Sequence, residues 1–221
     1  MADFWSVLRS GFPELASGFL VTLQLVGISF VVAVVVGTLV AALRTAPVKP
    51  LNWLGTVYVE AFRNVPLLVL LFISFAGFAR GGFPIPPLAA ATGSLGLYTA
   101  AYVAEAIRSG VFAVGKGQIE AALSLGLSYR RTLAKVVIPQ AVRTVIPPLG
   151  NLTIAMIKNS AIIGASLVTI RPDLLKAARI IQNDTFKTTE TFFWAGMGYL
   201  VLTLTATVAV RRLESRLAIR R

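Results

Sequence analysis

The side chains that this sequence lacks limit the chemistry that it can perform. Its 221 residues include no Cys and no His, which excludes thiol catalysis, disulfides, thiolate zinc sites and histidine bases. The nine carboxylates are scattered, without the spacing of a metal-ligand cluster. The segment from Gly110 to Gly117 nearly fits the phosphate-binding pattern G-x-x-x-x-G-K-[ST], but Gly117 offers no hydroxyl to magnesium. We therefore predict neither an enzyme acting alone nor a metal or cofactor bound by this chain.

Polar side chains within apolar stretches are the remaining candidates for chemistry. By spacing they fall on three helix faces, formed by Glu60, Arg63 and Asn64, by Tyr98, Tyr102, Glu105 and Ser109, and by Asn151, Ala155 and Lys158. A charge at membrane depth costs about 2.5–3.5 kcal/mol, so such residues are functional candidates by default. The predicted solute path is lined by Arg63, Asn64, Tyr98, Tyr102, Glu105, Arg108, Asn151, Lys158, Asn159 and Ser160.

Structural explanations compete with this functional one. Glu60 and Arg63 fit an ion pair within one helix, and so do Glu105 and Arg108. Lys158 has no acid one turn away, so it either pairs with Glu105 across helices or faces a substrate carboxylate. Nearby, Pro147, Pro148 and Gly150 are expected to break or kink the helix that precedes Asn151, as transport sites often require.

The composition indicates the elements that hold these residues. Hydrophobic residues make up 56% of the chain and charged residues 14%, compared with about 25% charged in a soluble domain. The net charge is nevertheless +12. Such a hydrophobic chain is no disordered basic tail, and no nucleic-acid partner is expected, because nucleic-acid binders carry their cations on a solvated surface. A bilayer is the expected surrounding.

Long uncharged runs predict an all-α membrane protein with five transmembrane helices. About 20 apolar residues cross the hydrocarbon core, and the runs from Leu15 to Leu43, Gly81 to Ala104 and Thr191 to Val210 are long enough. Two further spans are interrupted by charges. We predict one permease-like domain over residues 1–221, with a Pro- and Gly-rich loop over 81–93 and spans near 14–43, 52–79, 94–113, 141–168 and 190–212.

Basic residues set the expected orientation. With the N-terminus outside, 13 of the 21 Lys and Arg residues lie on the cytoplasmic side and 6 outside, as the positive-inside rule requires. Residues 220 and 221 are counted among the 13. The odd number of spans then leaves the C-terminus in the cytoplasm. Aromatic residues from Phe4 to Phe12 predict a short interfacial helix at the outer surface.

The cytoplasmic segment 114–140 has the pattern of a helix–turn–helix. Gln118 to Leu125 favours a short helix that Gly126 ends in the left-handed conformation. Ser128 is placed to cap a second short helix, which Pro139 is expected to close. A compact helical hairpin of this kind is more structure than an ordinary connection between two spans requires.

This segment resembles the E-A-A-x-x-x-G loop of ABC importer permeases, followed by I-x-L-P. Glu120, Ala121, Ala122, Gly126 and Pro139 match at the family spacing. The rest of the chain is similar to the permeases for polar amino acids of the histidine, glutamine and glutamate importers, through Phe62–Leu68, Ala101–Glu105, Leu149–Asn151 and Lys158–Ser160. The resemblance covers roughly residues 15–215 and implies a type I permease fold in a bacterial inner membrane.

What the resemblance implies is a transport subunit without its own ATPase. ATP and magnesium would be bound by a dimer of ATPase subunits, which would contact a coupling helix through Gln118, Glu120, Ala121, Ala122, Gly126, Arg130 and Pro139. A second permease chain, a paralogue in preference to an identical copy, and an extracytoplasmic solute-binding protein would complete the importer. Glutamate, glutamine or a related amino acid is the implied substrate.

The alternative is a carrier driven by an ion gradient. Glu60 and Glu105 would then carry protons. Such carriers often contain internal repeats, and this sequence has none, which disfavours the alternative.

Overall fold

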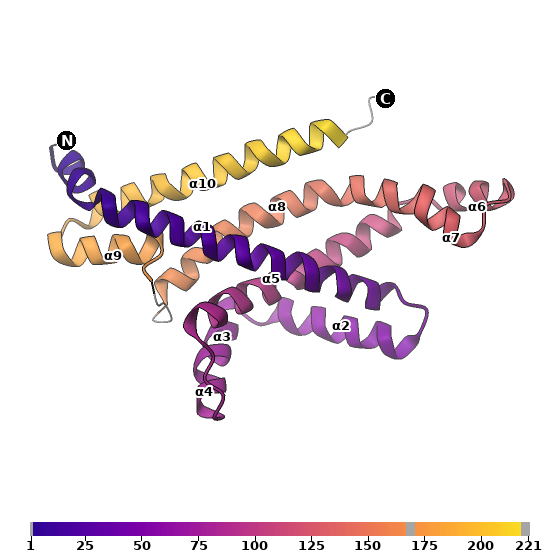
Figure 1. Ribbon diagram of the computed structural model, residues 1–221, viewed down its shortest axis with the longest axis horizontal. Coiled ribbons are helices and arrows are strands. Elements are labelled where there is room, and N and C mark those ends of the chain that lie inside the picture. Colours follow the sequence, from indigo (N-terminus) through magenta and orange to yellow (C-terminus); the bar gives the residue numbers. More distant parts are fainter. Residues whose placement is uncertain (1, 167–170, 218–221) are drawn as a thin grey trace.

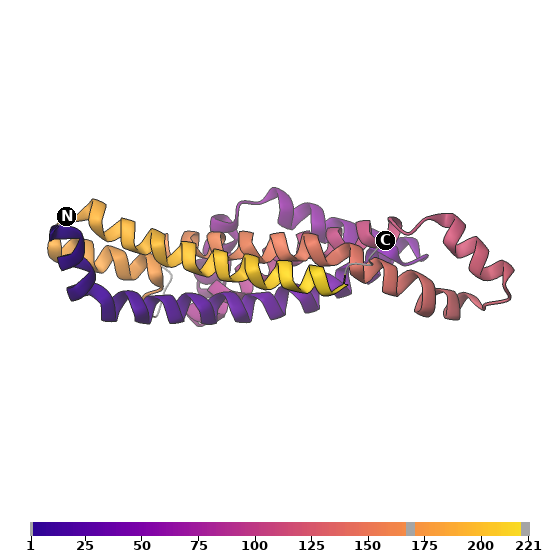
Figure 2. The same cartoon turned by 90° about the horizontal axis from the view of Figure 1, so that it is seen from above.

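The computed structural model describes residues 2–166 and 171–217, all of whose regular elements are helices. The long helices α1, α5, α8 and α10 run along one elongated body (Figures 1 and 2). In chain order the elements are α1 (Ala2–Thr45), α2 (Lys49–Asn64), α3 (Leu67–Phe72), the π-helical turn η1 (Ile73–Gly77), α4 (Phe78–Arg80), α5 (Pro87–Phe112), α6 (Lys116–Ser124), α7 (Tyr129–Thr132), the π-helical turn η2 (Leu133–Val137), α8 (Ile138–Ala165), α9 (Leu174–Thr185) and α10 (Thr188–Leu217).

Helix α5 forms the centre of the core because its small residues let other helices approach closely. Ala100, Ala101 and Ala104 are fully buried in it. A Cβ atom added at Gly96 would lie 2.7 Å from Val32 of α1, and one at Gly37 of α1 would lie 2.6 Å from Val103. Small residues at such contacts are typical of helices packed within membranes, where van der Waals contact drives association.

The N-terminal segment is part of α1 and not a separate helix. Pro13 lies inside α1, and the turns before it stand at an angle to the rest of the helix (Figure 2). Since Pro13 has no N–H, the carbonyl four residues earlier receives no helix hydrogen bond, which permits this bend. The expected interfacial helix is therefore the first part of a continuous one.

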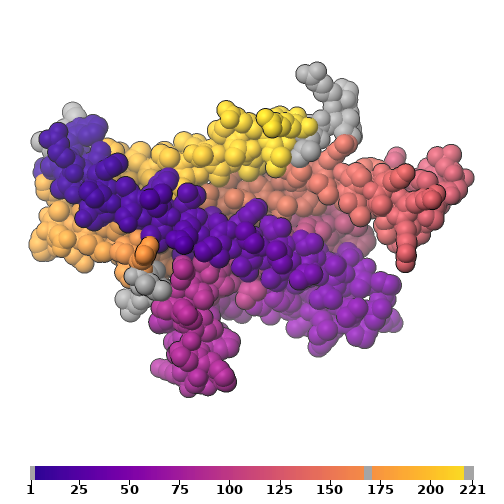
Figure 3. All heavy atoms as spheres, in the orientation of Figure 1, coloured from indigo at the N-terminus to yellow at the C-terminus, as the bar shows by residue number. Residues whose placement is uncertain are grey.

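The segment predicted as one span, 52–79, is broken. Helix α2 ends at Asn64, and the chain from Leu67 to Arg80 turns away from it by 104°. Val65 is extended (φ −99°, ψ 128°) because it precedes Pro66, whose ring disfavours the helical conformation there. The arm made of α3, η1 and α4 projects sideways from the body (Figure 3).

Two other differences from the predicted helices also involve prolines. The expected loop 81–93 is helical from Pro87 onward, since proline suits the first helical turn, where its missing N–H costs nothing. Pro147 and Pro148 lie inside α8, which continues through them, so of the expected break or kink the break is absent. The predicted fourth span ended at 168, and residues 167 and 168 lie outside the described residues, as do residues 220 and 221.

Helix α9 was not predicted. Asp173 caps it, because its carboxylate accepts a hydrogen bond from the Lys176 backbone N–H at 2.9 Å. Asp173 is fully buried, and the neighbouring Leu174 N–H donates to the Thr22 hydroxyl at 3.0 Å. Burial raises the pKa of the Asp173 carboxyl above its usual range.

Not every predicted span has the composition of a transmembrane helix taken alone. Among the described helices, α1 and α10 are long and apolar enough to cross a membrane, and the bent pair from Lys49 to Arg80 could supply a third span. Helices α5 and α8, with 26 and 28 residues, have the length but include many small and polar residues. The count of five spans therefore stays a prediction.

Candidate functional site

A small pocket lies between α5 and α8, where the predicted tyrosine face of α5 packs against α8. Its volume is about 170 Å³, and it is lined by Tyr98, Thr99, Tyr102, Leu152, Ala155, Met156 and Asn159. Drug-sized ligands occupy about 300–1,000 Å³, so this pocket suits a smaller solute. Apolar walls with a few hydroxyl and amide groups are the usual lining of such a site.

The two tyrosines of the pocket lie one helical turn apart on α5. The hydroxyl oxygens of Tyr98 and Tyr102 lie 3.0 Å apart and share a hydrogen bond. The guanidinium of Arg63, from α2, lies 5.4 Å from the centre of the Tyr102 ring, within cation–π range. Tyr98, Tyr102 and Asn159 were all predicted, and Arg63 reaches the pocket through Tyr102.

Glu105 belongs to a separate ionic cluster. Its carboxylate pairs with Arg44 of α1 and, at 2.5 Å, with Arg108 on its own helix. The Arg44 side chain is 12% exposed and that of Glu105 26%. The pairing of Glu105 with Lys158 across helices is therefore wrong, because α1 supplies the cation instead. The local pair with Arg108 is confirmed.

The other predicted residues are not brought to the pocket. Asn151 and Lys158 are exposed on α8, and Lys158 makes no ion pair within the described part of the chain. Asn64 donates to the Glu60 backbone carbonyl at 2.7 Å and to its carboxylate at 3.2 Å, whereas the expected Glu60–Arg63 pair is absent from these described residues. Ser160 is fully buried and donates to the Ile157 carbonyl.

Sequence reasoning missed Arg44 and part of the pocket wall. Arg44 directly follows the uncharged run from Leu15 to Leu43, so it looks like an ordinary charge at the end of a span. Its spacing from Glu105 in the sequence gave no signal. Thr99, Leu152 and Met156 carry no charge, so the sequence does not distinguish them from their apolar neighbours. The available signal was position, because Thr99 follows Tyr98 and Leu152 lies one turn before Met156.

Segment 114–140 forms the expected helical hairpin, at the opposite end of the molecule from the N-terminus (Figure 1). Gly126 has φ +80° and ends α6. The Leu127 N–H donates to the Ala122 carbonyl at 3.1 Å, and the Gly126 N–H donates to Leu123 at 2.9 Å. These two bonds form a Schellman motif, which requires a left-handed residue at the Gly126 position.

The predicted coupling residues are mostly at the surface of this hairpin. Ala122 is buried, and the exposed ones are Gln118, Glu120, Ala121, Gly126, Arg130 and Pro139. Leu125, 84% exposed, and Tyr129, 64% exposed, add apolar surface at the turn. An exposed apolar tip framed by charges is typical of a surface that another protein covers.

Two details of the hairpin were predicted wrongly. Ser128 occupies the N-cap position of α7, but its side chain makes no capping hydrogen bond. Pro139 does not close a helix: α7 passes through η2 into α8, and Pro139 lies in the first turn of α8. The π-helical turn ends at Val137, two residues before Pro139, and its wider backbone spacing accommodates the missing N–H.

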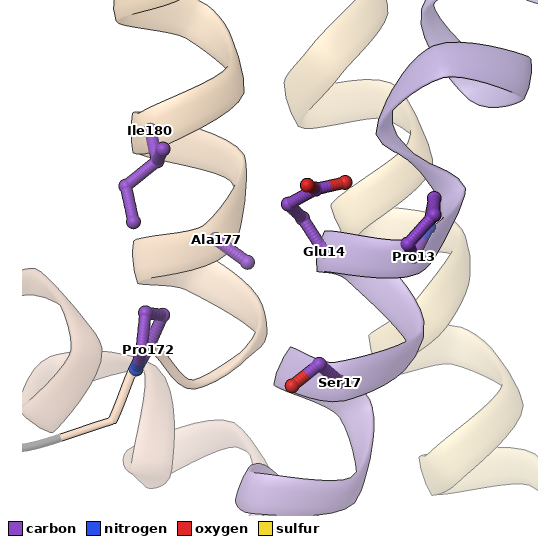
Figure 4. Close-up of a pocket in the computed structure, with 6 residues that line it drawn as sticks. All are labelled: Pro13, Glu14, Ser17, Pro172, Ala177 and Ile180. Atoms are coloured by element: carbon purple, nitrogen blue, oxygen red, sulfur yellow. The ribbon is translucent and has the colours of Figure 1, made fainter.

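A second hollow, of about 260 Å³, lies between α1 and α9 at the other end (Figure 4). It is lined by Pro13, Glu14, Ser17, Pro172, Ala177 and Ile180. The Glu14 carboxylate and the Ser17 hydroxyl supply its side-chain oxygens (Figure 4). This hollow differs from the α5–α8 pocket, because it is lined by different helices and contains a carboxylate.

These features define a helical membrane permease, with an internal polar pocket and a protruding hairpin. The chain belongs to the family of binding-protein-dependent transport system inner membrane components, whose model matches residues 33–219.

Relatives with known names agree with this assignment. The "Probable glutamine ABC transporter permease protein GlnM" of Bacillus subtilis is 39% identical, over 96% of this chain and 97% of that protein. The "Glutamate transport system permease protein GluC" of Corynebacterium glutamicum is 36% identical over the full length of both. A solved structure described as an amino acid ABC transporter with histidines has a TM-score of 0.90 at 35% identity, covering 98% of this chain and 99% of that one.

Proposed function

We propose that this chain is the membrane-spanning subunit of an ATP-driven importer of polar amino acids. Family membership and relatives named for glutamine and glutamate transport support the class of substrate. The observation that carries the proposal is the combination of a small polar pocket with a helical hairpin on the same continuous α7–η2–α8 rod. A solute site and a site for an energy-supplying partner are thereby linked within one element.

The pocket is proposed to hold the amino acid. Tyr98, Tyr102 and Asn159 offer hydroxyl and amide groups that can bind an ammonium, a carboxylate or a side-chain amide. The nearest carboxylate on α5, that of Glu105, is already paired with two arginines. Arg63, whose guanidinium lies over the Tyr102 ring, places a positive charge beside the pocket, which favours glutamate or glutamine over a cationic amino acid.

The hairpin is proposed to be the coupling helix that contacts a dimer of ATPase subunits. Its exposed tip and its position at one end of the body support this role (Figure 3). We place this end in the cytoplasm and the N-terminal end outside, in line with the distribution of Lys and Arg. An extracytoplasmic solute-binding protein would then deliver the amino acid at the N-terminal end.

A second permease chain is proposed to cover the exposed polar face of α8. Asn151 and Lys158 lie on that face within a predicted span, where a charge facing lipid would cost about 2.5–3.5 kcal/mol. A paralogue is the favoured partner. Because the chain has no Cys, oxidation would form a disulfide between Lys158→Cys and a single cysteine introduced at the matching position of either a second copy or a paralogue, which distinguishes the two partners. Crosslinks to neither would contradict the placement of this face.

The coupling role is tested by charge reversal at the hairpin. Glu120→Arg should leave membrane insertion unchanged but lower ATP-driven uptake of glutamine and glutamate into liposomes at least tenfold. Asp184→Arg is the matched control, because Asp184 is also exposed and lies on α9 at the opposite end. Equal uptake by the two variants would remove α6 from the coupling surface.

The same liposomes decide between ATP and an ion gradient. We expect uptake to require the ATPase subunits and ATP, and to be absent when the chain alone is given a proton gradient. Uptake by the chain alone under a proton gradient would establish a secondary carrier instead.

A further inference from the structure

The turns of α1 before Pro13 have two unlike faces. On the inner face Val7 is 1% exposed, and a Cβ atom at Gly11 would lie 2.7 Å from the Ile181 side chain of α9. The outer face carries Trp5, 64% exposed, and Phe12, 60% exposed, with Arg9 between them. Their spacing places the three side chains on one face of the helix.

The turns before Pro13 are held by contacts with the start of α10 and with Lys187, which lies between α9 and α10. The Trp194 indole N–H donates to the Phe4 carbonyl at 2.8 Å, and the Phe4 ring meets the edge of Phe193 with 5.4 Å between ring centres. Lys187 pairs with Asp3 at 2.5 Å, which lowers the pKa of the Asp3 carboxyl. The outer face is therefore presented by a helix held in place.

The charges of α1 indicate the depth of this face in a membrane. Asp3, Arg9 and Glu14 all precede the uncharged run from Leu15 to Leu43. At 1.5 Å per residue that run is about 43 Å long, which matches the about 40–45 Å of a bilayer with its headgroups. The turns before Pro13 thus begin at the outer edge of the headgroup layer, and their angle to the rest of α1 keeps them near it (Figure 2).

Arg9 has no polar partner within residues 2–166 and 171–217. Its guanidinium makes no hydrogen bond or ion pair with any residue that the structure describes. A hollow of about 440 Å³ is lined by Trp5, Leu8, Arg9 and Phe12. A guanidinium binds phosphate through its paired N–H groups, and the flanking rings suit the boundary between headgroups and acyl chains. The neighbouring hollow carries the Glu14 carboxylate, which repels a phosphate (Figure 4).

We propose that the Trp5–Arg9–Phe12 face is a binding site for the headgroup of an anionic phospholipid. Arg9 binds the phosphate, and the two aromatic rings flank the lipid at the interface. The site rests on the location of the chain in a membrane and is independent of the solute that the importer carries.

Brominated lipids, which quench tryptophan fluorescence on contact, test the site. Trp53→Phe leaves Trp5 and Trp194 as the only tryptophans, both at the contact between these turns and α10. In mixed micelles, half of the tryptophan quenching should be reached at a mole fraction of brominated phosphatidylglycerol about fivefold lower than that of brominated phosphatidylcholine. This ratio is expected for one cation near an anionic surface. Arg9→Gln should abolish this preference, because it removes the cation that binds the phosphate. The fold should remain intact, because Arg9 is exposed.

Arg171→Gln is the matched control. Arg171 is also an exposed arginine, next to Pro172 at the start of α9, and that variant should keep the fivefold preference. Equal losses in both variants would show a general effect of surface charge and overturn the site. A preference that survives Arg9→Gln would overturn it too. Displacement of the lipid by millimolar inorganic phosphate would identify a free-anion site in its place.

Discussion

The ionic cluster of Arg44, Glu105 and Arg108 permits a quantitative test of what Glu105 does. Glu105→Gln removes the only carboxylate of the cluster and leaves two arginines facing each other. If Glu105 braces α1 against α5, this loss lowers stability. If Glu105 instead forms an ion pair with Lys158, substitution of Lys158 should lower the stability.

The burial of the three side chains sets the magnitude. Their exposed fractions are 12% for Arg44, 26% for Glu105 and 33% for Arg108, between a surface pair and a buried one. Exposed pairs contribute about 0–1 kcal/mol, and breaking a buried pair costs about 3–5 kcal/mol. We therefore expect Glu105→Gln to lower the free energy of unfolding by about 2 kcal/mol, and Arg44→Gln by about 1 kcal/mol, since it leaves the Glu105–Arg108 pair intact.

A double-mutant cycle isolates the pair from secondary effects. Unfolding in mixed micelles with increasing dodecyl sulfate would be followed by circular dichroism for each single variant and for the double variant. The coupling energy between Arg44 and Glu105 should be about 1 kcal/mol, as for residues in direct contact. The matched cycle with Lys158→Gln should give no coupling beyond about 0.3 kcal/mol.

Two results would refute this reasoning. A coupling to Lys158 as large as that to Arg44 would restore the pairing that the structure rejects. A Glu105→Gln variant as stable as the unmodified chain, but with lost transport, would show that Glu105 acts on the solute and not on helix packing.

The remaining predictions concern turns and buried contacts. Gly126→Ala should destabilise the hairpin by about 1–2 kcal/mol, because left-handed backbone disfavours a Cβ, while Gly126→Asn should cost less; equal unfolding midpoints would contradict this. Gly164→Ala should cost about 1–3 kcal/mol, because the new Cβ would lie 2.3 Å from both Asp173 carboxylate oxygens, whereas the Cβ of Gly196→Ala meets nothing within 4 Å and should be neutral or stabilising in thermal unfolding. With the pKa of Asp173 raised by burial, the folded chain holds this proton more tightly than the unfolded chain, so stability should fall as pH rises above the ordinary value of 3.8. Asp173→Asn keeps a capping oxygen and should flatten that dependence of the melting temperature on pH, and parallel curves for the two proteins would rule out this role.

The sequence predicts the position of the long apolar helices better than the residues at which those helices begin and end. Uncharged runs mark where residues can meet lipid, but a helix starts and stops where backbone hydrogen bonds permit. Pro66 ends a helix, Pro87 starts one, and Pro147 lies inside one. A proline alone does not distinguish these positions, since the outcome depends on the register of the helix around it.

The candidate pocket was predictable in part. The helical spacing of Tyr98 and Tyr102 placed them on one face, and that face lines the pocket. The partner of Glu105 was not predictable, because Arg44 is 61 residues away and reaches it only through the packing of α1 on α5. Helix α9 was missed since its moderate length and polar residues lack the signal of a membrane span.

The π-helical turn η2 bears on how force could travel through this subunit. From Tyr129 to Ala165 the chain is one unbroken rod, about 55 Å long at 1.5 Å per residue. One end of this lever carries the hairpin, and its far half carries Asn159 and the pocket wall. The widened turn at Leu133–Val137 interrupts the regular hydrogen-bond ladder near the hairpin, as Pro147 and Pro148 do farther along the rod. A force applied at the hairpin would therefore be divided between bending at these interruptions and tilting of the rod as a whole, and their stiffness would set how far the pocket wall moves.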